Sequence, residues 1–406
     1  MDDLLAYLLL ALAVTPLVVT FIVSCSVIIQ IYVSGLLFLS IMLFIGFIND
    51  PTSNLEYYFF IVVSNFIVLS AAVLTHSHFL SLVHCVRRNT SFGYASRCKY
   101  DFGLFSLLAS LVACFLLVVG AGGVQAISAV WVDVADELSN NAGYRIFAIL
   151  AFILSIASVR MAIIHHEPIF LVLLTILFLV CFVLIVRVKL YIVPILLGLF
   201  YPTKEQRLNF LKISTMGISF LFFYIIVMFV RWLGSVNGLS YNDTSNTMKN
   251  VLEAGVERDL FSQFYSVMAY YDGVLEWGWG RAYQRLILIP FDTVFGTDWA
   301  PQNPMYHYFT IWNGRLVVGG SAHPALYADA FADFRWLGVF IPAIFLWVYA
   351  TIVLRSGLSF EGQVVLTSVF MSLPLIVRGS VFYGLFYMIM GFGMGYIIHV
   401  IRLLKS

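Results

Sequence analysis

Six basic side chains lie where a membrane protein disfavours them, at or beyond the outer end of an apolar run. They are Arg187, Lys189, Arg281, Arg285, Arg315 and Arg378. Snorkelling to lipid phosphates explains a single one, but several at one depth usually mark a substrate path. Guanidinium groups bind phosphate through paired, charge-assisted hydrogen bonds and stay charged at any relevant pH. Together they predict an outer site for a lipid-linked diphosphate, where they would also stabilise a departing diphosphate.

A second group of reactive residues follows a glycine turn in the stretch "VVGGSAHPALYADAFADFRWLG". Pro324 is favoured in the first turn of a helix, so His323 is expected at a helix start, where the helix dipole disfavours the imidazolium form. A neutral histidine can accept a proton from a hydroxyl group. Asp329 and Asp333 are four residues apart and share one helix face. The simpler alternative is that His323 caps the helix and the two aspartates form its solvated face.

Neither a metal site nor a cofactor is predicted. The spacing of His323, Asp329 and Asp333 matches no ligand motif. His165 and His166, in "IHHEP", fall at the cytoplasmic boundary and are interpreted as interfacial. The five cysteines include no CxxC pair, so the sequence indicates neither a zinc site nor a disulfide framework.

The composition sets the class of protein that must position these residues. The chain has 406 residues, 62% hydrophobic and 11% charged, with a mean hydropathy of +0.97. Soluble chains carry about 25% charged residues, so an all-α polytopic membrane protein is predicted. About 11 (10–12) spans are expected, near residues 4–24, 27–48, 57–84, 101–124, 145–165, 168–186, 188–201, 212–233, 337–355, 360–378 and 380–401. The run at 188–201 is short and contains Pro194, which favours a broken helix. A net charge of +1 argues against a nucleic-acid partner.

The distribution of lysine and arginine predicts the orientation. Three basic segments, "VRRNTSFGYASRCK", "TKEQRLNFLK" and the C-terminal tail, fall on one side of the alternation and are placed in the cytoplasm. The same alternation divides the chain into an N-terminal bundle (1–233), a large external loop (234–336) and C-terminal spans (337–406). Within the loop, "RLILIPFDTVFG" is apolar but too short to span, so a helix lying at the membrane interface is expected.

The stretch "GGSAHPALYADAFADFRWLG" resembles the H-P-T-x-x-G-D-x-Y-x-N-F-G-x-x-G segment of bacterial oligosaccharide repeat-unit polymerases, the Wzy class of O-antigen and capsule polymerases. The positions that fit are His323, Pro324, Tyr327, Asp329, Phe334 and Gly338. The departures are Ala325 for threonine, Ala328 for glycine, Phe331 for tyrosine, Asp333 for asparagine and Arg335 for glycine. The upstream piece "RAYQRLILIPFD" is also similar to that family. A further family pattern, an arginine followed by a glycine eleven positions later, occurs at Arg187–Gly198 and Arg285–Gly296.

This resemblance implies a metal-independent, inverting glycosyltransferase of GT-C-like fold in the bacterial inner membrane, with its active site facing the periplasm. It would join one undecaprenyl-diphosphate-linked glycan, the donor, to the non-reducing end of another, the acceptor. Arg187, Arg285 and Arg378, with Arg281 and Lys189, would hold the diphosphate. His323 would activate the acceptor hydroxyl, Asp329 would orient His323 or a sugar, and Tyr327, Asp333 and Arg315 would contact acceptor sugars. No cofactor is implied; the partners are membrane lipid and a chain-length regulator protein.

Other functions remain open at this point. An O-antigen ligase shares the architecture and the arginines, although the histidine-proline-tyrosine-aspartate run favours a polymerase. A flippase or transporter for the same lipid would place charged groups near the bilayer midplane, often on broken helices in two related halves, and the sequence shows no such halves. A structural scaffold gives no reason for basic groups on the outer side.

Overall fold

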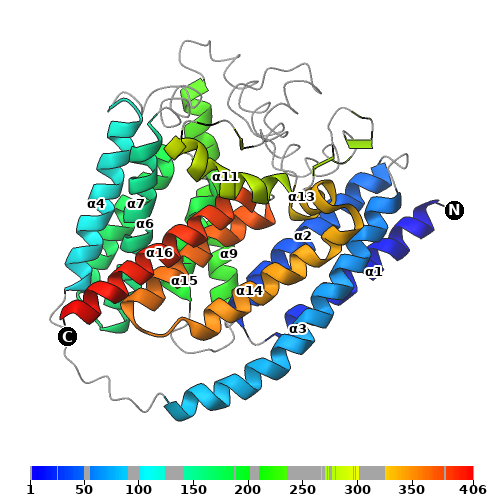
Figure 1. The fold of residues 1–406 in the computed structure, drawn as a ribbon, viewed down its shortest axis with the longest axis horizontal. Helices are drawn as coiled ribbons and strands as arrows, with labels where there is room; N and C mark the ends of the chain where they lie inside the picture. The colour runs from blue at the N-terminus through cyan, green and yellow to red at the C-terminus, as the bar shows by residue number, and fades with distance from the viewer. Residues whose placement is uncertain are drawn as a thin grey trace.

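The computed structural model describes the helical parts of the chain and short pieces between them. The described residues are 2–24, 26–49, 55–89, 101–123, 141–186, 189–201, 210–235, 267, 270–271, 273, 277–278, 280–295, 297, 299–300, 325–378 and 381–405. The regular elements among these residues are all helices, and no strand occurs there (Figure 1). The predicted all-α class is confirmed for this part of the chain.

Each predicted apolar run corresponds to a helix. In chain order the helices of the bundle are α1 (Asp2–Val23), α2 (Val27–Asn49), α3 (Leu55–Asn89), α4 (Phe102–Gly120), α6 (Ala142–Ile164), α7 (Ile169–Val186), η2 (Lys189–Tyr191), α8 (Ile192–Phe200), α9 (Phe210–Ser235), α13 (Ala325–Phe334), η3 (Arg335–Phe340), α14 (Ile341–Arg355), α15 (Phe360–Val377) and α16 (Val381–Lys405). Within the described residues, eight helices are long and apolar enough to cross a membrane, which confirms the multi-pass character. The count of eleven spans stays a prediction, since α8 has only 9 residues where a span needs about 20.

The bundle consists of two packed groups of helices that share α15. One core lies among α1, α2, α3, α13 and α14, where Tyr32 and Leu346 are fully buried. The other lies among α4, α6, α7, α8 and α16, around the fully buried Phe152. On α15, Phe370 belongs to the first core and Met371 to the second. This helix therefore holds the two groups in one body.

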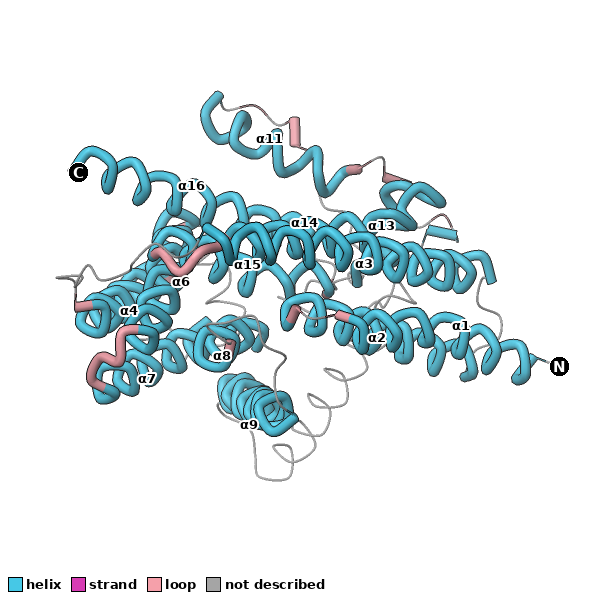
Figure 2. Tube along the Cα trace, turned by 90° about the horizontal axis from the view of Figure 1, so that it is seen from below, coloured by secondary structure: helices cyan, strands magenta, loops and turns pink. Residues whose placement is uncertain are grey.

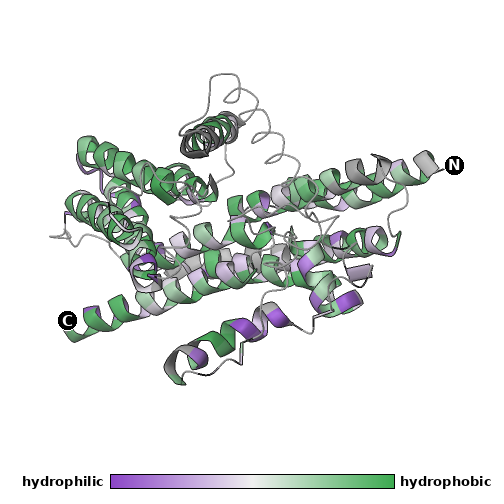
Figure 3. Cartoon of the chain, turned by 90° about the horizontal axis from the view of Figure 1, so that it is seen from above, coloured by the Kyte–Doolittle hydropathy of each residue, from purple (hydrophilic) through white to green (hydrophobic). Residues whose placement is uncertain are grey.

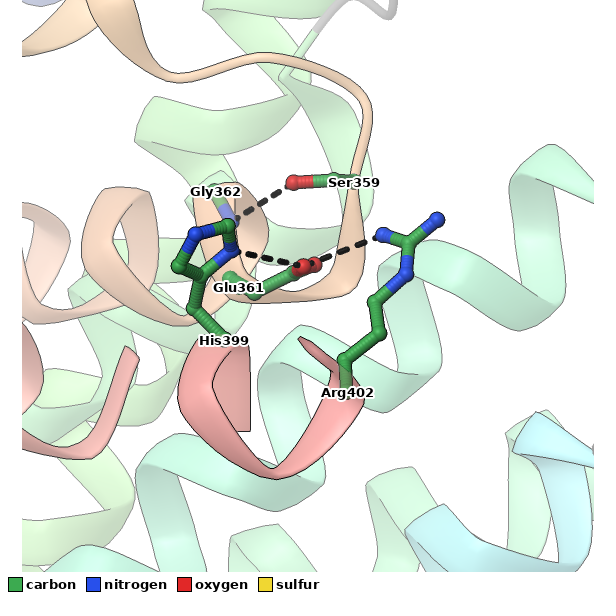
Figure 4. Close-up of polar contacts among 5 residues, drawn as sticks. All are labelled: Ser359, Glu361, Gly362, His399 and Arg402. Atoms are coloured by element: carbon green, nitrogen blue, oxygen red, sulfur yellow. Dashed lines mark hydrogen bonds and ion pairs between the residues drawn. The ribbon is translucent and has the colours of Figure 1, made fainter. Parts of the chain in front are cut away.

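The basic residues of the helix termini lie at one end of the bundle. Carboxylate groups there accept hydrogen bonds from basic side chains and from helix backbone N–H groups. Glu361, at the start of α15, accepts a hydrogen bond from Arg402 of α16 at 3.0 Å and lies 3.7 Å from His399 (Figure 4). Glu167 accepts hydrogen bonds from the first backbone N–H groups of α4, which have no partner within the helix. His165 stacks on Phe102 at the same end. We call it the basic end, and the opposite end the site end.

The short helix α8 ends against a buried arginine of α6. Arg160 is 3% exposed, and its Nη1 donates to carbonyl oxygens of Leu197, Gly198 and Tyr201 at 3.2–3.4 Å. Its Nε donates to Gln363 of α15 at 2.7 Å. The last carbonyls of a helix lack intrahelical partners and favour a positive charge. The broken helix predicted at 188–201 is thus a half-length helix whose C-terminal carbonyls bind a guanidinium group.

The apolar piece of the predicted external loop forms the helix α11 (Arg281–Phe295). It runs along the outside of α16 rather than inside the bundle (Figure 2). Ile287 and Phe295 are 63% and 67% exposed, and hydrophilic residues gather at the start of the helix (Figure 3). Exposed apolar residues together with hydrophilic ones are what an interfacial helix requires. The helix is therefore confirmed, and its place at the membrane surface stays a prediction.

Helix α13, which we expected within the external loop 234–336, lies in the core of the first group. Leu326, Tyr327 and Ala328 are 0% exposed. The Tyr327 hydroxyl donates to Asn65 of α3, and Asn65 donates to the Ala13 carbonyl of α1 at 2.9 Å. A buried amide and phenol that satisfy each other fix one register between packed helices. The bundle therefore holds α13 rigidly.

Candidate functional site

The predicted site residues are only partly among those that the structure describes. His323, Arg315 and Arg187 lie outside the described residues, and for Lys189 only the backbone, the first residue of η2, is described. Arg281, Arg285, Arg378, Tyr327, Asp329 and Asp333 can be placed. All of these except Tyr327 lie around α13, α11 and the junction of α15 with α16. The Tyr327 side chain faces into the bundle, so its predicted sugar contact does not enter the site built below.

The beginning of α13 is attached to the junction between α15 and α16. The N–H of Ala325 donates to the carbonyl oxygen of Arg378 at 3.0 Å. Arg378 is the C-cap residue of α15, and α16 begins at Val381. Ala325 has a φ of 66°, in the left-handed region that non-glycine residues seldom adopt. The first described residue of the motif, Ala325, thus contacts the backbone of Arg378.

Two further arginines reach the same helix start from other elements. The guanidinium carbon of Arg285, on α11, lies 5.6 Å from the ring centroid of Phe382. That of Arg145, on α6, lies 5.9 Å from the ring centroid of the next residue, Tyr383. Both distances are in the range of cation–π contacts. Arg285 and Arg145 thus contact neighbouring residues in the first turn of α16, a helix that begins three positions after Arg378.

Arg145 is a site residue that our reading of the sequence missed. Besides Tyr383, it interacts with Tyr191, whose hydroxyl lies 2.7 Å from that of Tyr387 on α16. Tyr191 ends the short helix η2 that Lys189 begins. The rule that marked Arg187 as an outer arginine also marks Arg145, which stands at the first position of the expected span 145–165.

The two aspartates of α13 face phenol groups, not solvent. Asp333 is only 7% exposed and Asp329 is half-buried, so Asp333 does not belong to a solvated helix face. Burial raises the pKa of Tyr270 and of Tyr283, and the charges of Asp329 and Asp333 raise it further. The two phenols therefore keep their protons at any physiological pH. They are hydrogen-bond donors beside a pair of carboxyl groups.

A tight turn holds the external segment against these carboxyl groups. The N–H groups of Gly278 and Gly280 donate to the carbonyls of Ala332 and Asp333 at 3.1 and 3.3 Å. Gly280 has a φ of 72°, and a Cβ at Gly278 would collide with Oδ1 of Asp333. Glycine is thus required at both positions. The turn leads into α11, so its geometry also places Arg281 and Arg285.

Helix α11 connects the two halves of the site. Arg281 and Arg285 are four residues apart and so share one face of the helix. Arg281 acts on Tyr270 beside the carboxyl pair, whereas Arg285 lies over Phe382 at the start of α16. One face of α11 thus places a positive charge beside the carboxyl pair of α13 and a second one at the start of α16. Anionic and hydroxyl-rich parts of one ligand would be bound side by side.

No protein-family model, no curated protein and no solved structure matches this chain. The resemblance to repeat-unit polymerases therefore depends on the motif residues alone, and the site must be judged by its geometry.

Proposed function

We propose that this chain is a membrane glycosyltransferase that polymerises lipid-diphosphate-linked oligosaccharide repeat units at the outer surface of the bacterial inner membrane. The observation that supports this most is that Arg285 and Arg145 lie over Phe382 and Tyr383 in the first turn of α16. This turn closely follows Arg378, whose backbone carbonyl accepts a hydrogen bond from the first residue of α13. Positive charge at a helix N-terminus, at the end of a membrane bundle, suits a diphosphate attached to a lipid.

The arrangement suggests where the donor lies during the reaction. With its diphosphate at the start of α16, the first sugar would extend along α13, since Ala325 lies against Arg378. A helix rises 1.5 Å per residue, so Asp329 and Asp333 are about 6 Å and about 12 Å along α13 from Ala325. These distances place the first sugar of the donor beside Asp329 and leave Asp333 for the acceptor sugar.

In the proposed reaction a hydroxyl oxygen of the acceptor attacks the anomeric carbon of the donor sugar from the face opposite the diphosphate. The new C–O bond forms as the bond from that carbon to the diphosphate oxygen breaks, and the leaving group takes the electron pair. The hydroxyl proton passes to a base, the predicted role of His323. The arginines stabilise the charge of the departing diphosphate, and Asp329 orients the acceptor or the base.

The partners follow from this chemistry. Undecaprenyl-diphosphate-linked glycans would serve as donor and acceptor, the site end would face the periplasm, and a chain-length regulator would act on the product. The multi-pass helical architecture supports a lipid-linked substrate, because such a molecule reaches the site from within the bilayer.

Incubation of the purified protein in lipid nanodiscs with defined undecaprenyl-diphosphate repeat units tests the proposal. We expect a ladder of products that differ by one repeat unit. Arg285→Ala should abolish the ladder, and Arg355→Ala, at the basic end, is the matched control that should leave it intact. A single transfer to a lipid A core in place of a ladder would indicate a ligase, and no transfer of any kind would refute the proposal.

A further inference from the structure

Arg335, immediately after α13, is held in a conformation that arginine disfavours. Its φ is 52°, in the left-handed region where a Cβ crowds the backbone and only glycine is unstrained. The resembling motif has glycine at this position. Strain of this kind persists where the surroundings enforce it, and it is concentrated at functional sites. The contacts of the Arg335 side chain should therefore explain the strain.

The guanidinium group of Arg335 lies flat against Trp277. Its carbon is 3.1 Å from the centroid of the indole ring. The indole is fixed in turn by Tyr270, which stacks at 5.1 Å, and by Tyr271 and Phe331, which meet it edge-on at 5.6 and 5.5 Å. A guanidinium group held against a fixed ring is pre-organised, so it loses little conformational freedom when it binds a ligand.

The donors of this guanidinium group have no protein acceptor among the described residues. Arg335 is exposed, and in the described part of the chain its guanidinium group contacts Trp277 and acts electrostatically on Tyr271. A guanidinium group carries five N–H donors. One face lies over the indole ring, and a ring contact of this kind leaves the N–H donors in the guanidinium plane available. Strain, stacking and donors without an acceptor among the described residues together indicate an external ligand.

Next to this arginine lies a carboxylate with a second indole. Glu56, at the start of α3, accepts a hydrogen bond from the Trp336 Nε1–H at 2.8 Å and from the Tyr271 hydroxyl at 2.7 Å. Trp336 follows Arg335 in the chain and is 44% exposed. Two distant segments of the chain, residues 335–336 and the start of α3, thus bring an exposed indole, a planar guanidinium group and a carboxylate together.

This combination suits a sugar ring. The C–H face of a pyranose packs on an indole, which offers a rigid apolar surface. Adjacent hydroxyl groups can accept the paired N–H groups of arginine and donate to a carboxylate. A purely structural contact between Arg335 and Trp277 would explain the stacking. It would not explain why a strained arginine is exposed with no acceptor for its donors in the part of the chain that the structure describes.

We propose that Arg335, Trp336 and Glu56 form the subsite for the acceptor sugar, at the opposite end of α13 from the diphosphate. This subsite rests on the proposed function. Helix α13 has 10 residues and is about 15 Å long, with the carboxyl pair between its ends. The donor would enter from Arg378 and the acceptor from Arg335, and the two would meet beside Asp329 and Asp333.

Binding of a free glycan tests the subsite separately from polymerisation. The probe is the repeat-unit oligosaccharide released from the host's own lipid-linked pool, without lipid or diphosphate, titrated into the protein in nanodiscs by calorimetry and saturation-transfer NMR. We expect Arg335→Gly, which relieves the strain, to weaken binding about tenfold to a hundredfold. Glu56→Gln should weaken it similarly, whereas Arg285→Ala, at the diphosphate end, should leave it unchanged.

The outcomes separate the two proposals. If the wild-type protein makes a ladder but Arg335→Gly keeps both its glycan affinity and its acceptor KM, the subsite is refuted and the polymerase proposal is not. If the wild-type protein makes no ladder while glycan binding still depends on Arg335, the subsite is supported and the polymerase proposal fails. Arg335→Lys controls for charge, and we expect it to restore less than half of the affinity because lysine lacks the planar donor edge. Thermal unfolding confirms that each variant is folded.

Discussion

Gly278→Ala tests whether the external turn positions the carboxyl pair. The new methyl group would collide with Oδ1 of Asp333 and lie 3.4 Å from Cγ of Arg281. Asp333 is 7% exposed, so its carboxyl group cannot swing into solvent, and the turn or the helix must move. Overpacking of this kind costs about 1–3 kcal/mol.

The cost in activity should exceed the cost in stability. A shift of about 1 Å in positioned groups can lower a rate about 100-fold, so we expect loss of the product ladder with a fall of a few degrees in the unfolding midpoint. Gly217→Ala on α9, where a Cβ meets nothing within 4 Å, is the matched control and should be neutral or slightly stabilising.

A second substitution locates the cause. If the collision with the Asp333 carboxyl group is responsible, Asp333→Ala in the Gly278→Ala background should restore most of the lost stability, although not activity. Equal activity and stability of Gly278→Ala and Gly217→Ala would show that the turn does not constrain the site.

Three further predictions concern other parts of the molecule. Arg145→Ala should lower kcat/KM about 10- to 100-fold and Arg145→Lys should recover part of it, measured as ladder formation; an unaffected alanine variant would remove Arg145 from the site. Arg160→Met leaves the carbonyls at the end of α8 without their donor, so the free energy of unfolding should fall by about 1–3 kcal/mol, measured by denaturant titration in detergent; unchanged stability would contradict the proposed role. The Thr297 hydroxyl and the Trp299 N–H lower the pKa of Asp292 by hydrogen bonding to its carboxylate. The contribution of these bonds to the stability of the turn should therefore be complete above the ordinary carboxyl pKa and be lost as the pH falls through the lowered pKa. Hydrogen exchange of the Trp299 amide as a function of pH measures this, and loss of protection already at the ordinary carboxyl pKa would contradict it.

The bundle could be predicted from the sequence because hydropathy and lysine–arginine bias report directly on helices that cross a membrane. The place of α13 could not. Asp329, Asp333 and Arg335 interrupt the apolar run, so the expected span began at residue 337. In the structure Tyr270 and Tyr283 cover the carboxyl pair, and this cover comes from segments more than 40 residues away.

Arg285 and Arg378 could be predicted as members of one basic group, whereas our reading of the sequence missed Arg145. Spacing along the chain does not show that Arg145, Arg285 and Arg378 approach one helix start from α6, α11 and α15. Arg160 went unnoticed for the same reason, since its acceptors lie on α8 and α15. The role of Glu56 depends on Tyr271 and Trp336, which donate hydrogen bonds to it from distant segments. Tertiary contacts decide the role of each of these residues.

The most direct test of the central claim is the affinity of the protein for undecaprenyl diphosphate that carries no glycan, measured by native mass spectrometry and by titration in nanodiscs. We predict that replacing Arg145, Arg285 and Arg378 together by alanine weakens binding at least about 100-fold, since each charge-assisted contact contributes about 1.5–3 kcal/mol, whereas Arg355→Ala at the basic end changes nothing. Binding by the triple variant that equals that of the wild-type protein would contradict the account.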